Sequence, residues 1–321
     1  MKRLCFLVIC MSIIMGCSTS TSRTKALVDY VDPNIGTAHC RWFFYTPAAI
    51  PFGMAKLAPS TDAHLGNPGG WQAVGYDFRH TSIEGFANFH EFQVGGVVFA
   101  PTVGELQTVP GELENPDGGY RSRFDKKDEV AAPGYYSVLL KDYGVKAELT
   151  AMKRVGFHRY TYPKTEQANL IFDIGNKQGE SGEVKDAEVQ YFEDGRVEGY
   201  VITSPVYVNI YQKGADVRMY FSAVLNKKPV QVGTFVKDVV NPGKHQEKGP
   251  GAGLYMTFST EEQEAVEVKV GLSYTSIENA RFNRETEAAD VTFDQAKKNA
   301  TDVWNESLSR IYVEGGKETD K

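Results

Sequence analysis

Residues 135–162 read YYSVLLKDYGVKAELTAMKRVGFHRYTY, and this stretch decides the fold class. Two apolar and β-branched runs, Tyr135–Lys141 and Val145–Met152, lie on either side of Asp142-Tyr143-Gly144. Strand-forming runs that flank a short glycine-containing turn are typical of a β-hairpin. A third run, Arg154–Tyr162, follows directly. The stretch therefore predicts three consecutive strands.

Similar runs continue along the chain at near-regular spacing. They are Asn169–Ile174, Ala187–Phe192, Arg196–Ser204, Val206–Gln212, Val217–Leu225, Gly253–Ser259 and Val266–Tyr274. Upstream, residues 92–103 predict a buried strand with a close backbone approach at Gly95 and Gly96. The Gly-, Pro- and Lys-rich residues 236–252 predict a mobile loop. Many short strands without a fixed repeat indicate an all-β sandwich or barrel and argue against a propeller.

The pattern changes near the C-terminus. Apolar residues from Phe293 to Ile311 follow helical spacing, and Thr292 with Gln295 forms a capping box. We therefore expect an amphipathic helix of about five turns, whose apolar stripe needs a partner surface.

Composition narrows the class of function. The 321 residues carry a formal net charge of −6, which argues against a nucleic-acid partner because such proteins present a basic face. Aromatic residues make up 12% of the chain. They suit both sheet packing and sugar stacking, so composition alone does not distinguish the two.

The N-terminus predicts export. Lys2 and Arg3 precede an apolar run from Leu4 to Met15, which is a signal-peptide pattern too short to span a bilayer. The run ends at Gly16-Cys17, which resembles a bacterial lipobox. That resemblance implies a signal peptide over 1–16, acylation of Cys17, a tether over 17–26 and attachment to the cell envelope, in the periplasm or at the outer membrane. An ordinary signal peptide with an incidental cysteine is the alternative.

Polar and aromatic residues gather between positions 39 and 91. Four of the 6 histidines lie there (His39, His64, His80 and His90), together with Trp42, Trp71, Asp62, Asp77, Glu84 and Glu91. Aromatic rings beside hydrogen-bonding side chains suit a sugar site. Scattered loop and core positions would give the same composition. Cys40, also in this region, is expected to be a buried hydrophobe or a surface thiol.

Other chemical signatures are weak. Glu84 and Glu91 could act as an acid/base pair, but the sequence gives no distance between them. His90-Glu91 lacks the second histidine of a zinc-binding His-Glu-x-x-His helix. No Gly-x-Ser-x-Gly nucleophile elbow is present.

Several ordered blocks together resemble glycoside hydrolase family 92, the calcium-dependent exo-α-mannosidases. The blocks are YVDPNIGT (30–37), PFGM (51–54), LAPSTD (57–62), GYDF (75–78), IEGF (83–86), PTVG (101–104), PGYY (133–136), ELT (148–150), HRYTYP (158–163), GLSY (271–274), Trp304 and VEGG (313–316). The similarity spans residues 28–316.

The resemblance implies a large, supersandwich-like β-sandwich over 27–276, which is the family's N-terminal domain. An α-helical linker over 277–321 would follow, truncated before an (α/α)6 catalytic barrel. In the family the active site lies between these domains. The general acid, the general base and the Ca²⁺ ligands come mainly from the barrel, and the reaction inverts the anomeric centre of mannose-containing glycans. We therefore expect no catalytic or metal-binding residue in this chain, and we expect the isolated chain to be inactive.

We expect His39, Trp71, His90 and Glu91 to line the substrate site, although each could instead have a structural role at the domain interface. In many members the block after Gly85-Phe86 has a Ser-His-Thr-His-like pattern. Here His90 keeps the second histidine and Asn88 stands in place of the first. This block is expected to face the pocket, so the linkage preference could differ from the α-1,2 type.

Three functions compete at this stage. The chain is the substrate-side domain of an α-mannosidase whose catalytic domain could be separately encoded, a stand-alone carbohydrate-binding envelope lipoprotein, or an interaction-only envelope lipoprotein. The predicted helix leaves apolar surface exposed, so we also expect a tendency to aggregate or to bind a partner.

Overall fold

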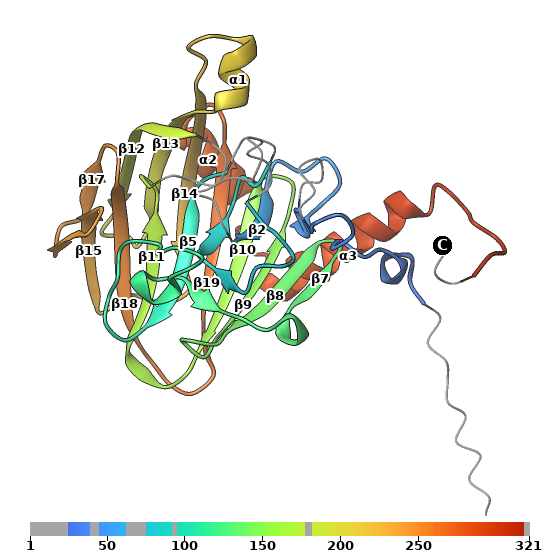
Figure 1. The fold of residues 1–321 in the computed structure, drawn as a ribbon, viewed down its shortest axis with the longest axis horizontal. Coiled ribbons are helices and arrows are strands. Elements are labelled where there is room, and N and C mark those ends of the chain that lie inside the picture. The colour runs from blue at the N-terminus through green and yellow to red at the C-terminus, as the bar shows by residue number, and fades with distance from the viewer. Residues whose placement is uncertain (1–24, 39–44, 62–74, 92–94, 177–181, 318–321) are drawn as a thin grey trace, which may run out of the picture.

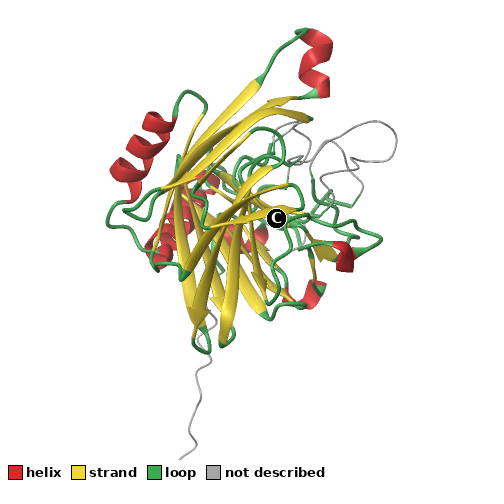
Figure 2. Ribbon diagram, turned by 90° about the vertical axis from the view of Figure 1, so that its left-hand side faces the viewer, coloured by secondary structure: helices red, strands yellow, loops and turns green. Residues whose placement is uncertain are grey.

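The structure is a computed structural model that describes residues 25–38, 45–61, 75–91, 95–176 and 182–317, with the side chains of Val206 and Tyr207 left out. Two large antiparallel sheets stack face to face, and helices cover part of the outside (Figures 1 and 2). The expected all-β sandwich followed by a helical segment is confirmed.

Within the described residues, the first sheet has eight strands. In spatial order they are β1 (Ala48–Ala49), β2 (Lys56–Ser60), β4 (Gly85–Ala87), β5 (Val98–Val103), β11 (Thr165–Asp173), β18 (Ala252–Thr260), β15 (Gln231–Val236) and β16 (Val239–Pro242).

The second sheet has nine strands over the same described ranges. They are β17 (Gln246–Lys248), β12 (Glu183–Tyr191), β13 (Val197–Ser204), β14 (Val217–Leu225), β19 (Glu264–Ser273), β10 (Val155–Tyr162), β9 (Val145–Ala151), β8 (Tyr135–Leu140) and β7 (Val130–Ala132). A small additional sheet joins β3 (Ser82–Ile83) to β6 (Ser122–Arg123). The helical elements are η1 (Leu27–Tyr30), η2 (Pro116–Gly118), η3 (Lys126–Asp128), α1 (Val206–Tyr211), α2 (Ile277–Ala288) and α3 (Phe293–Leu308).

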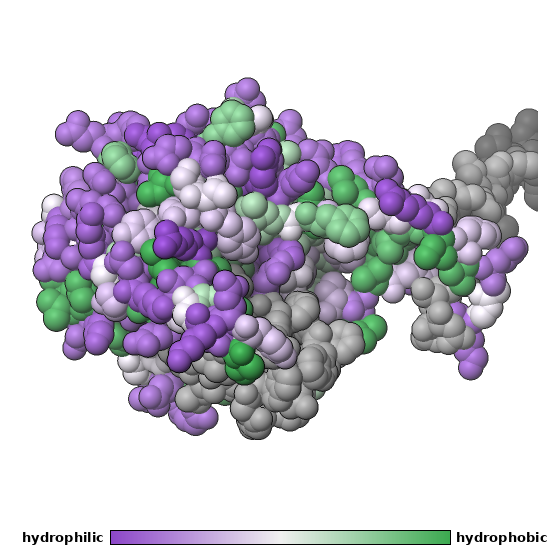
Figure 3. Space-filling view, turned by 90° about the horizontal axis from the view of Figure 1, so that it is seen from above, coloured by the Kyte–Doolittle hydropathy of each residue, from purple (hydrophilic) through white to green (hydrophobic). Residues whose placement is uncertain are grey.

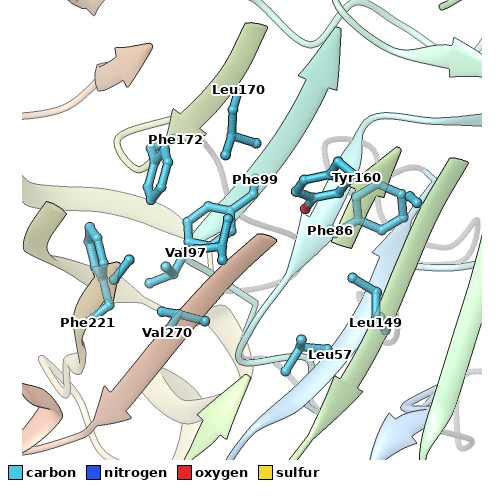
Figure 4. Close-up of a cluster of buried hydrophobic side chains, with 14 of the residues drawn as sticks. Leu57, Phe86, Val97, Phe99, Leu149, Tyr160, Leu170, Phe172, Phe221 and Val270 are labelled. Atoms are coloured by element: carbon cyan, nitrogen blue, oxygen red, sulfur yellow. The ribbon is translucent and has the colours of Figure 1, made fainter. Parts of the chain in front are cut away.

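The main core lies between the two large sheets. Phe99 of the first sheet packs on Phe172 with ring centroids 4.1 Å apart, and Phe221 of the second sheet lies against Phe172 (Figure 4). All three rings are fully buried. Removing this much aromatic surface from water is the main contribution that holds the sheets together.

Strand β10 shows why the outer face needs the helices. Tyr160 and Tyr162 belong to the inter-sheet core. Val155 and Phe157 point the other way because side chains alternate across a strand, and they pack with Phe293 of α3. Helix α3 begins with the expected capping box, in which the Thr292 hydroxyl accepts from the Gln295 N–H and the Gln295 side chain accepts from the Thr292 N–H. The predicted helix and its cap are confirmed, and the β-sandwich itself supplies the partner surface for its apolar stripe.

Two expectations from local sequence are wrong. The run Val206–Gln212 forms helix α1 instead of a strand. The Asn209 amide donates to the carbonyl of Pro205 and to the carbonyl of Ala215, and these local bonds stabilise the helical turn despite the β-branched residues around it.

Residues 236–252 form ordered structure instead of a mobile loop. They contain β16 and β17, and the Glu247 carboxylate accepts hydrogen bonds from Thr234 and Lys244. In the predicted strand over 92–103, the described strand begins only at Val98. At Gly96 an added Cβ would meet the side chain of Met219, and the Gly96 carbonyl accepts from the backbone N–H groups of Asn88 at 3.1 Å and Phe89 at 3.4 Å, so neighbouring backbone also lies close to this glycine.

Candidate functional site

Buried polar groups gather where strand β2 ends. The Thr61 N–H donates to the carbonyl of Gly75 at 2.6 Å. This bond joins the two described residues that flank 62–74. The Ser60 hydroxyl donates to the Glu84 carboxylate at 2.8 Å, and the Glu84 N–H donates to the Ser60 carbonyl at 2.9 Å. These bonds fix the end of β2 against the segment before β4.

Thr61 links this point to the residues that follow Gly75. Its hydroxyl oxygen accepts from the Asp77 N–H at 3.0 Å and lies 3.0 Å from Nδ1 of His80. The buried guanidinium of Arg121 donates to the Thr61 carbonyl. A single threonine thus joins the end of β2 to the segment 75–80 and to Arg121.

Asp77 is an ion-pair partner and not a proton donor. Burial raises its pKa, but hydrogen bonds from the Arg79 side chain and N–H outweigh burial and lower the pKa to about 2. A carboxyl with this pKa remains ionised at neutral pH and does not suit general acid catalysis.

His90 is buried against the same point. Its N–H donates to the Lys56 carbonyl at 2.9 Å, and its side chain packs on Gly75, where an added Cβ would lie 3.1 Å from Nε2. Gly75 has φ +55°, a conformation that favours glycine. The neighbouring Glu91 instead forms an ion pair with Lys56 at the surface. His90 therefore belongs to this polar cluster, and Glu91 lies at its rim.

A stack of tyrosines connects the cluster to the N-terminal segment. The rings of Tyr45 and Tyr76 are stacked at 3.9 Å, and the Tyr45 hydroxyl donates to the Asn34 side chain at 3.1 Å. The Phe78 N–H donates to the carbonyl of Thr37 at 3.2 Å. The described residues on either side of 39–44 and of 62–74 are thus joined to one another.

We call these residues the shared base of the candidate site. They are Asn34, Thr37, Tyr45, Ser60, Thr61, Gly75, Tyr76, Asp77 and Phe78. Of the residues expected to line a site, His90 contacts this base through Gly75. His39 and Trp71 lie outside the described residues, as do Cys17 and Cys40.

Within the block that was expected to face the pocket, Asn88 instead lies in the core. Its side chain is fully buried, with Oδ1 2.9 Å from Nε2 of His158 and Nδ2 donating to the Val97 carbonyl at 2.6 Å. Strand β4 ends at Ala87, so the regular alternation of a strand, which would place residues two apart on one face, does not extend to Asn88 and His90. Asn88 is a core residue, whereas His90 lies at the cluster.

Sequence reasoning also missed Thr61 and Arg121. Thr61 was visible within the block LAPSTD, but its role depends on Gly75, which lies fourteen residues on in the printed sequence. Arg121 carried no local signal, because it meets Thr61 only through the fold.

The described residues do not fit a metal site. They contain no group of three or more His, Cys, Asp or Glu side chains that could hold a metal ion. The calcium implied by family resemblance therefore has no ligand set in this part of the chain, and no chemical step is assigned to it here. Over the same described ranges, no helix is long and apolar enough to cross a membrane.

Comparison with known proteins identifies what this architecture is similar to. The model of the glycosyl hydrolase family 92 N-terminal domain matches residues 30–273. A family 92 α-mannosidase of Bacteroides thetaiotaomicron, solved in complex with mannoimidazole, matches with a TM-score of 0.79 and 29% identity over 89% of this chain and 37% of its own. No curated protein sequence matches the chain.

Two further solved structures are similar. A family 92 glycosyl hydrolase has a TM-score of 0.74 and 26% identity over 90% of this chain and 38% of its own. A family 92 inverting mannosidase of Bacteroides thetaiotaomicron has a TM-score of 0.75 and 22% identity over 93% of this chain and 38% of its own, which supports the fold alone. This chain thus spans less than half the length of each of these three solved structures.

Proposed function

The chain belongs to glycosyl hydrolase family 92, and from this premise we propose that it is the N-terminal, substrate-side domain of an exo-acting, inverting α-mannosidase that takes mannose-containing glycans. The observation that carries the proposal is the match of residues 30–273 to the family's N-terminal domain, together with 29% identity to a mannosidase solved with mannoimidazole.

The shared base supports a role in substrate binding instead of bond cleavage. It holds donors and acceptors in fixed positions, which suits recognition of sugar hydroxyls. Its one strongly perturbed carboxyl, Asp77, is paired with Arg79 and stays ionised. Inverting hydrolysis needs a protonated carboxylic acid and a second carboxylate that activates water. In the proposal, both carboxyls and the Ca²⁺ ligands come from the part of the mannosidases that this chain does not match.

An exposed apolar surface supports the expected contact with that part. Beside η1, α3 and the turn after β1, the large side chains of Ile35, Phe52, Ile311 and Tyr312 are 70%, 95%, 76% and 85% exposed. Seen from above, hydrophobic side chains gather at the end of the molecule from which α3 projects (Figure 3). Exposed apolar patches of this kind mark interaction sites. The occupant in the proposal is the helical barrel of a mannosidase, on the same or a separate polypeptide.

The N-terminal residues support a proposed location. Lys2, Arg3, the apolar run to Met15 and Cys17 fit an exported protein that is lipid-anchored to the bacterial cell envelope through Cys17. Mass spectrometry of the protein purified from a bacterial membrane fraction tests this. Loss of residues 1–16 and a diacylglyceryl mass on Cys17 are expected. A protein that retains Met1, or an unmodified Cys17, would contradict it.

Calorimetry of the purified chain with α-mannobiose tests the function, with cellobiose as a matched control sugar. We expect weak heat of binding with mannobiose, none with cellobiose, and no release of mannose from α-mannosides by the chain alone. Absence of heat with both mannobiose and mannan would show that this chain does not bind these sugars. That result would also contradict the alternative of a stand-alone carbohydrate-binding lipoprotein. Release of mannose that EDTA abolishes would show that the chain itself is catalytic.

A further inference from the structure

A row of aromatic and charged side chains crosses the outer face of the second sheet. The strand register pairs Lys248 with Glu188, Glu188 with Tyr200, and Tyr200 with Tyr220. We call these four residues the tyrosine row. It passes over four adjacent strands, β17, β12, β13 and β14, and so spans about 14 Å. This length exceeds the size of a single sugar ring.

The tyrosine row points away from the core between the sheets. Val201, Met219 and Phe221, which neighbour the two tyrosines in the chain, are fully buried in that core. Because side chains alternate across a strand, Tyr200 and Tyr220 lie on the opposite, outer face. Both tyrosines are half-buried there. The aromatic part of the row is therefore partly open to solvent.

The two aromatic rings are held in a defined arrangement. The ring centroids of Tyr200 and Tyr220 lie 6.1 Å apart, with an interplanar angle of 49°. The Tyr200 hydroxyl donates to Asp186 at 2.9 Å, whereas the Tyr220 hydroxyl makes no hydrogen bond to any described residue. Rings that are already ordered lose little conformational entropy when a ligand binds. The pair thus offers a preorganised apolar surface beside one available hydroxyl.

Polar side chains next to the rings are fixed as well. Gln246 donates to one carboxylate oxygen of Glu188 at 2.6 Å, and the Lys248 nitrogen lies 3.0 Å from the other. A carboxylate has about four acceptor positions, so Glu188 can still accept from a ligand hydroxyl. Gln190 lies on the same face of β12, two residues from Glu188, and its side-chain amide makes no hydrogen bond to a described residue. Donors and acceptors therefore flank the rings.

We propose that the tyrosine row binds a neutral glycan chain. Aromatic rings pack on the C–H face of a pyranose, and fixed polar groups bind its hydroxyls. Charges on this face balance, because Lys248 and the exposed Arg218 accompany Glu188 and Asp186, so the face does not select a charged chain. The length of the row favours several linked sugars over one.

This site lies apart from the shared base of the candidate site. The row belongs to β17, β12, β13 and β14 of the second sheet, whereas the shared base is built where β2 of the first sheet ends. The inference therefore goes beyond the proposed function and does not depend on it.

A protein partner fits the row less well than a glycan. The cores of protein interfaces are depleted in Lys, Glu and Asp, yet Lys248, Glu188 and Asp186 surround this tyrosine pair. Cross-strand aromatic pairs also stabilise a sheet without any ligand. The test must therefore separate binding from a purely structural role of the rings.

Affinity electrophoresis of the full chain tests the proposal, with soluble polysaccharides cast in a native gel. The neutral probes are yeast α-mannan, dextran and mixed-linkage β-glucan, and polygalacturonate is the charged probe. We expect at least one neutral probe to slow the wild-type chain and Tyr220→Thr to weaken that binding at least tenfold. Threonine suits a strand. Phe282→Ala is the control, because it removes a 60% exposed ring of α2 outside the row, and it should change binding less than twofold.

Two milder variants keep the test decisive if Tyr220→Thr fails to fold, which urea unfolding reveals. Tyr220→Phe retains the ring and its packing, so binding should weaken by less than about threefold. Gln190→Ala removes a partly exposed amide without touching the core, and binding should weaken by at least threefold. A structural role of the rings alone predicts no effect of Gln190→Ala on binding.

Several outcomes would overturn the inference. One is that no neutral probe slows the wild-type chain, or that only polygalacturonate does. Another is that wild type, Tyr220→Thr and Gln190→Ala are slowed equally, because the sugar would then bind elsewhere. Light scattering that shows a dimer in wild type and a monomer in Tyr220→Thr, without polysaccharide binding, would assign the row to a protein contact.

Mannobiose calorimetry on the same variants separates this inference from the proposed function. A disaccharide bound at the shared base should give the same heat in wild type and Tyr220→Thr. If wild type binds no mannobiose but loses polysaccharide binding in Tyr220→Thr, only the proposed function fails. If both proteins bind mannobiose equally and no neutral polysaccharide slows wild type, only the tyrosine row fails as a glycan site.

Discussion

Between the two sheets, Nε2 of His158 lies 2.9 Å from Oδ1 of Asn88. The amide orientation of Asn88 follows from its other bond, because Nδ2 donates to the Val97 carbonyl at 2.6 Å and Oδ1 must then accept. Nε2 of His158 therefore carries a proton, and Nδ1 accepts from the Tyr160 hydroxyl at 2.8 Å. This arrangement satisfies a neutral imidazole, which accepts at one nitrogen and donates at the other.

Acid should destabilise the domain through His158. Burial lowers the pKa of His158 to about 3, whereas the unfolded chain has a value near 6.5. The unfolded state thus binds more protons in this range, so the stability contribution is complete above pH 6.5 and is lost as the pH falls towards 3. Between pH 7 and 4.5 we expect the free energy of unfolding to fall by about 2–3 kcal/mol through this residue.

Urea unfolding at both pH values, in wild type and His158→Gln, measures this. Glutamine can donate to Asn88 but cannot reproduce the imidazole packing, so the variant should be less stable at pH 7. Because glutamine does not titrate, the free energy of unfolding of the variant should fall less than that of wild type between pH 7 and 4.5. An equal loss in both proteins would assign the pH dependence to other groups.

Gly75→Ala should disturb the shared base by contact as well as by backbone strain. The residue has φ +55°, and an added Cβ would lie 3.1 Å from Nε2 of His90 and 3.3 Å from the Ser60 hydroxyl. Gly144 is the matched control, with φ +63° and no atom within 4 Å of an added Cβ. We expect a loss of about 1 kcal/mol for Gly144→Ala and about 2–3 kcal/mol for Gly75→Ala, from chemical denaturation. Equal losses would mean that backbone strain alone explains both.

Glu198→Ala should weaken the attachment of helix α2. The Arg281 guanidinium donates to Glu198 through Nε at 2.7 Å and Nη2 at 2.6 Å, and Arg196 donates at 3.0 Å. Burial raises the pKa of Glu198, but hydrogen bonds from Arg281 and Ser222 outweigh it and lower the pKa. The Arg281 side chain is 35% exposed, so solvent compensates part of its charge once Glu198 is removed, and we expect a loss of about 1–3 kcal/mol.

An exposed pair on helix α3 gives the control. Lys298 donates to Asp302 at 2.5 Å, and the two side chains are 74% and 57% exposed, so Asp302→Ala should cost less than about 0.5 kcal/mol. Limited proteolysis should cleave α2 faster in Glu198→Ala alone. Unchanged cleavage would show that apolar packing by itself holds the helix.

Local sequence signals recovered the features that depend on neighbours in the chain. The hairpin at Asp142-Tyr143-Gly144 and the capped start of α3 each arise from residues a few positions apart, so both could be predicted. Helix α1 was misread because its β-branched residues favour a strand, whereas Asn209 closes a helical turn.

The candidate site was recoverable only in part. His90 was expected at a site because of its residue type and motif, and it lies in the polar cluster. Its companions Thr61 and Arg121 meet the cluster only through long-range contacts, which no spacing in the sequence encodes. The same reason explains Asn88, whose direction depends on the register of the block against His158.

Phe52 carries the last prediction. It occupies the third position of the turn Ile50–Gly53, which the Gly53 N–H closes by donating to the Ile50 carbonyl at 3.0 Å. Its φ is +59° and its side chain is 95% exposed. A β-turn with positive φ at this position normally has glycine or asparagine there, so Phe52→Gly should stabilise the chain by about 0.5–1 kcal/mol.

Alanine and asparagine separate the causes of that gain. Phe52→Ala removes the ring but keeps the strain, so its stability should match wild type within about 0.5 kcal/mol, whereas Phe52→Asn should fall between alanine and glycine. If Phe52→Ala stabilised the chain as much as Phe52→Gly, the gain would come from removing the exposed ring. If Phe52→Gly destabilised the chain, the ring would have to pack against the protein in solution. A bulky ring kept exposed on a strained turn costs the isolated chain stability, and the proposed contact with a catalytic barrel gives it a compensating role.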